Sequence, residues 1–229
     1  MILKMYDLAG AESDRRFSPY CWRVRMAIAH KGLDVETIPW RFSDKDVLTP
    51  SGQGKVPVLV HGDNWIHESW DIAEYLENTF PDRPSLFGGP LGKSLSRLYA
   101  NMGDVMAAQI VRMVLMDIYD RLDEQDKPYF RESREQRFGM SLEKVVEGRE
   151  QRLEAFRESL LPLRMTLRKQ RFFGGDSPLY ADYALFAQFQ WARCISPFAL
   201  LADDDPVKEW RDRLLSAFGG LAKAAPAYD

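Results

Sequence analysis

The chain has few cysteines, few histidines and no long apolar run. Cys21 and Cys194 lie far apart, which excludes a disulfide framework and predicts a protein of the reducing cytoplasm. His30, His61 and His67 lack the spacing of metal ligands, so we expect no metal site. The apolar stretches are short and the first residues show no leader pattern, so we expect no membrane partner.

An excess of positive charge is also lacking. The formal net charge is −3, and Lys and Arg are interspersed with acids along the helical segments. Such a chain has no basic field that would attract phosphates, which argues against nucleic acid as a partner. Hydrophobic residues make up 45% of the 229 positions, enough to bury a sizeable core in one or two domains.

The N-terminal part alternates short strand-like and helical segments. Pro19 in a first turn and Gly32 after a last turn mark the ends of one helix. His61-Gly62-Asp63-Asn64 predicts a hairpin turn. The strands are predicted at 2–8, 35–40, 56–60 and 65–67, and the helices at 19–31 and 69–80. This order, βαβ and then ββα, predicts an α/β domain over residues 1–82.

The remaining chain is predicted to be all-helical. Residues 83–91 are rich in proline and glycine and have no periodicity, so we interpret them as a linker to a second domain at 92–229. Apolar stripes run from Leu95 to Met113 and from Leu142 to Leu167, the second with an expected kink at Pro162.

Three other helical segments differ from these stripes. Residues 180–191 are apolar on all sides, which is typical of a buried helix. Residues 120–137 are so highly charged that we interpret them as a solvated loop with a short helix. A last amphipathic helix is expected from Pro206.

Three short motifs follow one another in the N-terminal half. Ser18-Pro19-Tyr20 opens a helix, Val56-Pro57 opens a strand, and Glu68-Ser69 opens the next helix. A hydroxyl at a helix N-terminus can hold a thiolate, because free N–H groups and the helix dipole favour negative charge there. A proline in a strand can free a backbone edge for a ligand, and an acid-hydroxyl pair can bind an amino acid end. Together the motifs predict a peptide-thiol site, although each alone could be a helix cap or a blunted edge.

In this order the motifs resemble those of the cytosolic glutathione transferases. The segment from Ser18 to Arg25 is similar to the first-helix motif of the serine-type classes, and Lys55-Val56-Pro57 is similar to their cis-proline loop. Glu68-Ser69 is similar to the start of their γ-glutamyl-binding helix. Within the family, a second group of segments is most similar to the bacterial lignin β-etherase branch and its fungal relatives. They are Ser18-Pro19-Tyr20 followed by Trp22-Arg23, the charged segment 131–136, Glu147-Gly148-Arg149-Glu150, and Gly174-Gly175-Asp176 with Ala181-Asp182-Tyr183.

The resemblance implies a fold, an activity and a set of roles. The fold would be a thioredoxin-like domain followed by an all-α domain, in a cytoplasmic homodimer that serves detoxification. Glutathione would be the co-substrate, and Ser18 would be the catalytic residue that stabilises its thiolate. The residues implied in binding glutathione are Tyr20, Gln53, Lys55, Val56, Pro57, Glu68 and Ser69.

The energetics of the thiolate support this role for Ser18. A thiol with a pKa near 8.5 is only a few per cent ionised at pH 7, so the site must lower this pKa by about two, or roughly 2.7 kcal/mol. A helix terminus supplies about 0.3 to 2 kcal/mol, and a hydrogen bond to a charged group about 1.5 to 3. Either one is marginal alone, and the two together suffice.

The thiolate is expected to attack a small apolar or aromatic electrophile held between the domains, with aromatic ether cleavage as one form of the reaction. Methionine and aromatic side chains at helical spacing suit an adaptable pocket, although the same pattern is typical of a core. The candidates are Phe17, Tyr20, Trp40, Tyr99, Met102 and Met106.

Cys21 keeps two alternatives open. It stands at the second cysteine position of a thioredoxin-like C-x-x-C, where the attacking first cysteine is replaced by Ser18. It is expected to be a small buried residue, but a thiol transferase or glutathione lyase that uses Cys21 is a rival enzyme. A non-catalytic ligand-binding protein of the same fold is the other alternative.

Overall fold

The computed structural model describes residues 2–228 and contains one mixed sheet of four strands. The strand order is β2-β1-β3-β4, with β1 parallel to β2 and antiparallel to β3. A hairpin joins β3 to β4, as the His61-Gly62-Asp63-Asn64 turn predicts. The strands are β1 (Leu3–Leu8), β2 (Val35–Trp40), β3 (Val58–His61) and β4 (Asn64–His67).

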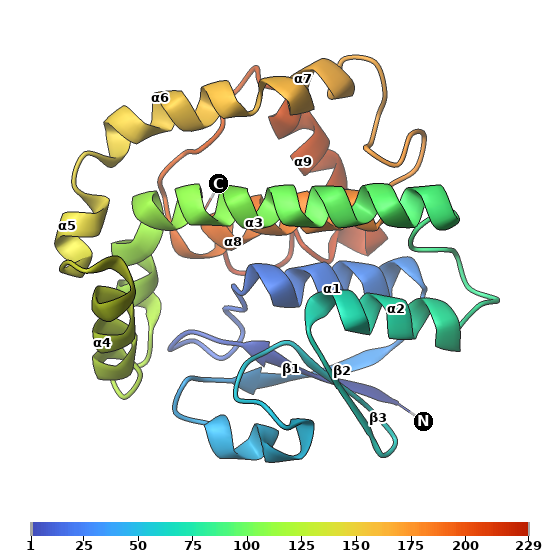
Figure 1. The fold of residues 1–229 in the computed structure, drawn as a ribbon, viewed down its shortest axis with the longest axis horizontal. Helices are drawn as coiled ribbons and strands as arrows, with labels where there is room; N and C mark the ends of the chain where they lie inside the picture. Colours follow the sequence, from blue (N-terminus) through green and yellow to red (C-terminus); the bar gives the residue numbers. More distant parts are fainter. Residues whose placement is uncertain (1, 229) are drawn as a thin grey trace.

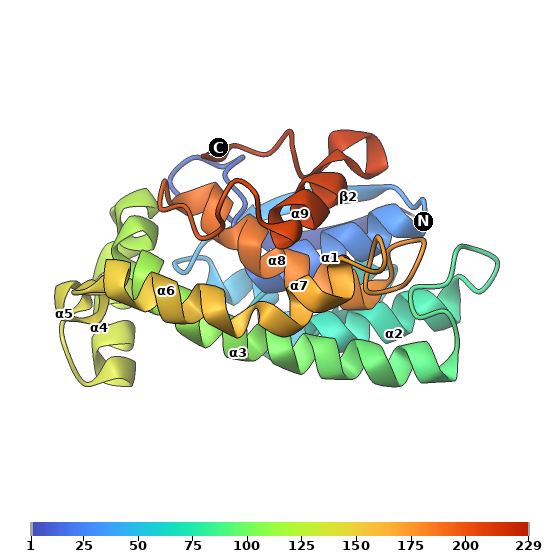
Figure 2. The same cartoon turned by 90° about the horizontal axis from the view of Figure 1, so that it is seen from above.

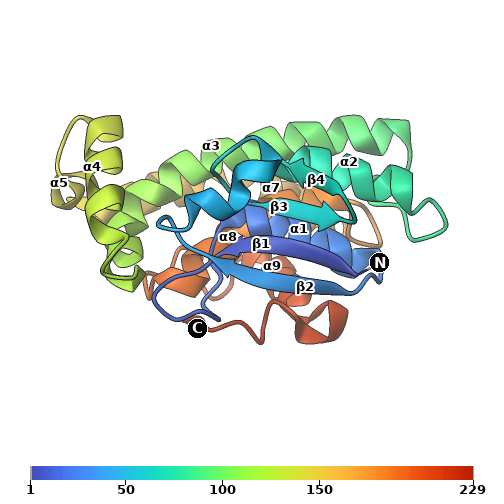
Figure 3. The same cartoon turned by 90° about the horizontal axis from the view of Figure 1, so that it is seen from below.

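Two helices cover one face of this sheet. They are α1 (Pro19–His30) and α2 (Ser69–Thr79), and both lie between the strands and the C-terminal helices (Figure 1). Seen from below, the strands lie in front and the helices behind (Figure 3). A short 3₁₀ helix, η1 (Lys45–Ser51), lies in the connection between β2 and β3. The βαβ and ββα order expected from the sequence is confirmed.

The rest of the chain is helical, and α3 (Pro90–Arg121) is its longest element. Helix α8 packs against both α1 and α3, so it joins the two halves of the molecule. Helices α6, α7 and α9 form an outer layer over α3 and α8 (Figure 2). The remaining helices are α4 (Lys127–Phe138), α5 (Leu142–Val146), α6 (Arg149–Ser159), α7 (Leu161–Leu167), α8 (Tyr180–Ile195) and α9 (Pro206–Ser216), with the short η2 (Phe218–Gly220).

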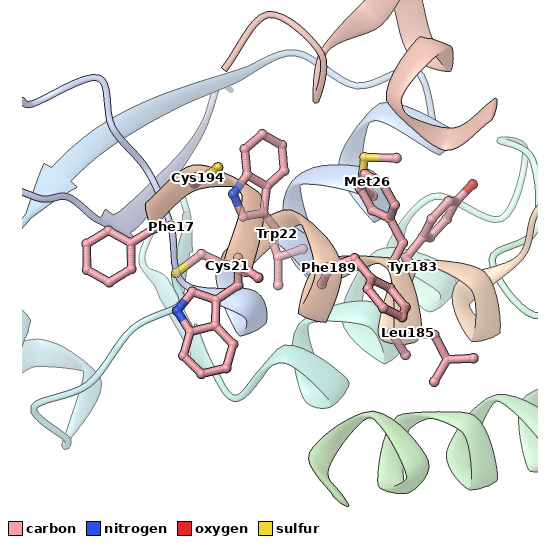
Figure 4. Close-up of a cluster of buried hydrophobic side chains, with 14 of the residues drawn as sticks. Phe17, Cys21, Trp22, Met26, Tyr183, Leu185, Phe189 and Cys194 are labelled. Atoms are coloured by element: carbon pink, nitrogen blue, oxygen red, sulfur yellow. The ribbon is translucent and has the colours of Figure 1, made fainter. Parts of the chain in front are cut away.

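Helix α8 is the centre of the core. Every residue of this helix except Arg193 is buried, as its uniformly apolar sequence predicts. Figure 4 shows its Tyr183, Leu185 and Phe189 in one cluster with Trp22 and Met26 of α1. Where α3 crosses α8, a Cβ on Gly103 would lie 2.8 Å from the carbonyl oxygen of Ala184. The absence of a side chain at residue 103 therefore permits this close approach.

Helix α8 starts without a hydrogen bond to the side chain of its N-cap residue. Leu179 has no polar atom to cap the helix, and Asp182 takes over the local bonding. Its carboxylate accepts hydrogen bonds from the backbone N–H of Phe173, Gly174 and Leu179, at 2.8 to 3.0 Å, and from Trp210 Nε1 at 2.8 Å. These four donors stabilise a carboxylate whose burial raises its pKa.

Two expectations for the helical half are corrected. The stripe from Leu142 to Leu167 is not one helix with a kink but three helices, which are interrupted at Gly148 and Leu160. Gly148 has a φ of 74°, a left-handed conformation that glycine adopts without strain. The charged segment 120–137 is not mainly a loop, because α4 occupies Lys127–Phe138 and buries Phe130.

Candidate active site

The three N-terminal motifs converge at one edge of the sheet. In the hairpin, Val58 pairs with His67, so Val56-Pro57 and Glu68-Ser69 lie at the same end of the two strands. Val58 also pairs with Tyr6, close to the end of β1. The chain returns from this edge to α1 through a hydrogen bond from Phe17 N–H to the Leu8 carbonyl, at 3.2 Å. Segments far apart in the sequence thus meet beside the start of α1.

Ser18 is the N-cap residue of α1. Its extended backbone (φ −60°, ψ 126°) lets its side chain turn back over the first turn. Its Oγ accepts a hydrogen bond from the Cys21 N–H at 3.3 Å, and Ser18 lines the cavity between the domains. The hydroxyl can therefore donate its own hydrogen to an anion that lies at the helix N-terminus.

The second and third motifs lie beside each other. The Val56-Pro57 peptide bond is cis, and Val56 is half-buried just before β3. Glu68 is exposed and has a φ of 62°, a left-handed conformation that is rare for a residue other than glycine. Such a conformation is costly, and strained residues of this kind cluster at active sites and ligand-binding segments. Ser69 is the first residue of α2, and its carbonyl accepts a hydrogen bond from the Tyr180 hydroxyl at 2.9 Å.

The loop before Val56 carries the remaining candidates. Gln53 donates from Nε2 to the Lys55 carbonyl at 2.6 Å, which orders the loop. The Lys55 side chain is exposed, and within residues 2–228 it forms no ion pair. Both residues thus lie in the approach to Val56, and Lys55 offers a positive charge there.

A cavity of about 240 Å³ begins at Ser18 and extends between the two domains. Its inner wall comes from α1, α3 and α8 and is mainly apolar, and α4 closes its outer side. Asp126, just before α4, accepts hydrogen bonds from the backbone N–H of Phe42 and Ser43 at 3.2 and 2.8 Å. These bonds fix α4 to the loop after β2 and therefore hold the cavity closed on that side.

The structure brings some of the predicted acceptor residues to this cavity. Phe17 and Tyr20 line it, together with Ser18. The ring of Tyr20 lies against the Arg23 guanidinium, whose carbon is 4.8 Å from the ring centroid. Arg23 Nη2 in turn donates to Asp104 Oδ1 at 2.8 Å. Tyr20 thus packs against an arginine that an ion pair between α1 and α3 holds in place.

Four predicted acceptor residues lie elsewhere, and this corrects the sequence expectation. Trp40 is buried and donates from Nε1 to the Asp44 carbonyl at 2.9 Å. Tyr99 packs on Phe173, with 4.9 Å between ring centroids. Met102 and Met106 belong to the core around α3 and do not line the cavity. Helical spacing identifies apolar residues, but it does not say which neighbour they face.

Most cavity residues that were not predicted from the sequence come from α3, α4 and α8, and two come from β1 and the loop after β2. The sequence offered one signal on α4, because the spacing of Phe130, Arg134 and Arg137 places all three on one face of a helix. The charged character of the segment masked it. The missed lining residues are Leu8, Phe42, Asp104, Ala107, Ala108, Val111, Leu115, Ile118, Phe130, Arg134, Arg137 and Trp191.

Cys21 lies in the core and not in the cavity (Figure 4). It is fully buried, and burial, with the nearby Asp7 carboxylate, raises the pKa of its thiol well above the usual value. Burial also raises the pKa of Cys194, to about 12. Neither thiol is accessible to solvent, as a reactive cysteine must be.

Within residues 2–228, no cluster of three or more His, Cys, Asp or Glu side chains is arranged to hold a metal ion. In the same part of the chain, no helix combines the length and apolar character needed to cross a bilayer.

Comparison with known proteins assigns both halves of the chain. Residues 13–84 match the family model described as the glutathione S-transferase N-terminal domain, and residues 95–216 match the one described as the C-terminal domain. "Glutathione S-transferase U1" of Arabidopsis thaliana is 31% identical over 72% of this chain. "Glutathione S-transferase U6" of the same plant is 28% identical over 72%. The chain spans 63% and 64% of the length of these two relatives.

Solved structures share the fold over nearly the whole chain. A glutathione S-transferase of Ceriporiopsis subvermispora, solved in complex with glutathione, aligns with a TM-score of 0.82 at 22% identity and covers 99% of both chains. The glutathione transferase GSTFuA3 of Phanerochaete chrysosporium aligns with a TM-score of 0.77 at 24% identity, over 97% of this chain and 94% of that one.

Proposed function

The chain belongs to the glutathione S-transferase family, and from this premise we propose that it is a serine-type enzyme that joins glutathione to an apolar electrophile. The observation that carries the proposal is the position of Ser18. Its hydroxyl lies at a helix N-terminus, and Ser18 lines a mainly apolar cavity. A thiolate held there would face an acceptor bound in the cavity.

The groups around the sheet edge fit the tripeptide. Glu68 is exposed, and within residues 2–228 it forms no ion pair, so its carboxylate is available to the α-ammonium group. The start of α2 at Ser69 suits the neighbouring α-carboxylate. Val56 would pair its backbone with the cysteinyl residue, with Pro57 shaping the loop. Lys55, with Gln53 beside it, would receive the carboxylate of the glycine.

The proposed reaction is a displacement. Ser18 and the start of α1 together lower the pKa of the thiol enough to favour its ionised form at pH 7. The sulfur forms a bond to an electrophilic carbon of the acceptor while the bond from this carbon to the leaving group breaks with its electron pair. With an aromatic ether the leaving group is a phenolate, so cleavage of β-aryl ethers is one form of the same chemistry.

The position of Cys21 favours this mechanism over the rival based on a cysteine. A thiol transferase needs an accessible thiolate, whereas Cys21 is buried and its pKa is raised. A non-catalytic protein of this fold would bind glutathione and apolar ligands without turnover. A panel of electrophiles separates this alternative from an enzyme.

We also propose that the protein is a homodimer. Leu91, Leu95, Leu98 and Val105 form a stripe along one side of α3, and their exposed fractions are 75%, 47%, 55% and 64%. A stripe at heptad-like spacing is the pattern through which helices pair. Such a surface on a long helix is better covered by a second copy than exposed to water.

The test of the proposed function combines binding and turnover. Calorimetry should give a glutathione dissociation constant in the range of ordinary substrates, and a panel of aryl halides, epoxides and β-aryl ethers should contain at least one acceptor that is consumed. Absence of glutathione binding would remove the proposal. Binding without turnover of any acceptor would favour the non-catalytic alternative.

A further inference from the structure

Two arginines of α4 share the face of the helix that closes the cavity. Arg134 and Arg137 line the cavity together with Phe130, which lies one helical turn before Arg134 and two turns before Arg137. The Arg134 guanidinium carbon lies 4.6 Å from the centroid of the Phe130 ring and 5.5 Å from that of Phe42. Aromatic rings therefore hold its planar group in place. Because Asp126 fixes the start of α4, the helix that carries both arginines is held against the loop after β2.

The charge of these two side chains is not balanced by acids. Within residues 2–228, neither Arg134 nor Arg137 forms an ion pair, whereas their neighbour Arg131 pairs with Glu135 and Glu143, both at 2.9 Å. Burial and the nearby positive charge of Arg137 lower the pKa of Arg134. Two guanidinium groups close to each other, and without a carboxylate, form a site that an anion would stabilise.

The one carboxylate of the cavity wall does not neutralise them. Asp104 Oδ1 accepts a hydrogen bond from Arg23 Nη2 at 2.8 Å, so its charge is already matched by a buried arginine. The cavity thus has Ser18 on its α1 side, apolar walls from α3 and α8, and a net positive charge on its α4 side. An acceptor that fits this arrangement has an apolar body and one anionic group.

The size of the cavity limits this body. A cavity of roughly 150 Å³ accommodates benzene in an engineered protein, and this cavity has about 240 Å³. One aromatic ring with a small acidic substituent and a leaving group fits, whereas two fused or linked rings would extend into solvent.

We propose that Arg134 and Arg137 bind a carboxylate of the acceptor, so that the preferred substrate is a monocyclic aromatic acid with an electrophilic carbon. This inference rests on the proposed function, because it concerns the second substrate of the same site. With 4-chloro-3,5-dinitrobenzoate, the glutathione sulfur bonds to the ring carbon that bears chlorine, and the chloride leaves with the electron pair. The carboxylate takes no part in the chemistry and stays on the arginines.

Binding of unreactive probes tests the inference without requiring catalysis. We compare 3,5-dinitrobenzoate with 3,5-dinitrobenzamide, which has the same shape and no charge, on the glutathione-loaded protein. Trp191 lines the cavity, so quenching of its fluorescence reports occupancy. The wild type should bind the acid at least about tenfold more tightly than the amide, as a charge-assisted hydrogen bond implies.

The variants assign this preference to the arginines. Arg134→Gln and Arg137→Gln should each reduce it, and the double variant should abolish it. Arg134→Lys should retain part of it, because the charge remains while the forked geometry is lost. Arg168→Gln removes the same charge from an exposed position outside the cavity and should leave the preference unchanged. Should Arg134→Gln fail to fold, Arg137→Gln alone still decides the question.

Three results would overturn the inference. One is equal binding of acid and amide by the wild type. Another is a preference that survives in the double variant. The third is a loss of glutathione affinity in the double variant with unchanged binding of the aromatic acid, which would place the arginines in the glutathione site. If the protein binds neither glutathione nor any acceptor, the proposed function fails as well, whereas turnover of 1-chloro-2,4-dinitrobenzene without acid preference refutes the inference alone.

Discussion

Replacing Ser18 by alanine should raise the pKa of bound glutathione. Few backbone amides at the start of α1 can compensate for the hydroxyl. Pro19 has no N–H, the Cys21 N–H points to Ser18 Oγ at 3.3 Å, and the Trp22 N–H bonds to the Ser18 carbonyl at 3.0 Å. The hydroxyl is therefore expected to supply the larger share of the stabilisation.

The size of the effect follows from the energy of one hydrogen bond to a charged group. About 1.5 to 3 kcal/mol corresponds to a rise of the thiol pKa by about one to two. If the wild type holds a pKa near 6.5, most of the bound thiol is ionised at pH 7, and the Ser18→Ala variant retains roughly a tenth of it. The transfer rate at pH 7 should fall about tenfold, and this loss should be recovered as the pH is raised above the new pKa.

The assay is the ultraviolet absorbance of the thiolate in the glutathione complex, titrated against pH. Circular dichroism checks the fold, because loss of this N-cap also costs about 0.5 to 1 kcal/mol of stability. Cys21→Ala is the matched control, since it changes the adjacent buried thiol without touching the cavity. Bound glutathione whose pKa is the same in Ser18→Ala and the wild type would refute the reasoning. Loss of activity in Cys21→Ala alone would favour the cysteine mechanism.

Other substitutions test the rest of the site and the fold. Glu68→Gln should weaken glutathione binding about tenfold in calorimetry, because the ammonium loses its charged partner; unchanged affinity would exclude Glu68 from the site. Gly103→Ala should lower the free energy of unfolding by about 1 to 3 kcal/mol in urea, since its Cβ would lie 2.8 Å from the Ala184 carbonyl oxygen; a neutral result would contradict the close approach of α3 to α8. Burial lowers the pKa of His30 below 6.5, so the unfolded chain takes up the proton first and stability should fall as the pH drops below about 6.5; His30→Gln should remove this part of the slope. Leu98→Glu should shift the sedimentation coefficient to that of a monomer, and a wild type that already sediments as a monomer would exclude the dimer.

In the N-terminal half, local sequence signals predicted the limits of several elements. Pro19 and Gly32 marked the limits of α1, and β2 runs over the predicted residues because its β-branched run is short and clearly bounded. The roles of the motif residues stay predictions. Their proximity, however, is set by the register of Val58 with His67.

In the helical half, the sequence pattern did not predict where the helices begin and end. The stripe from Leu142 to Leu167 has helical periodicity throughout, yet the chain turns at Gly148 and at Leu160 to follow the outside of α3 and α8. Periodicity cannot distinguish one helix from three when the apolar positions stay in phase.

Most residues that line the cavity beside Ser18 could not be identified from the sequence. Tyr99, Met102 and Met106 on α3 were chosen for their side chains, but the residues of α3 that reach the cavity are smaller or aliphatic, such as Ala107 and Val111. Which side of α3 faces the cavity depends on its crossing with α8. Arg134 reaches the cavity because α4 packs against the loop that contains Phe42.

The sequence by itself determined the order of elements in the N-terminal half, the buried character of α8 and the three motifs from which we inferred a peptide-thiol site. Propensity, capping and periodicity act between residues near one another in the chain, so they can be read from it directly. Only the tertiary structure decided that Cys21 is enclosed, that α4 closes a cavity beside Ser18, and that two arginines line this cavity without forming an ion pair with any residue from 2 to 228. These features depend on contacts between distant segments, and their burial and charge exist only after the chain has packed.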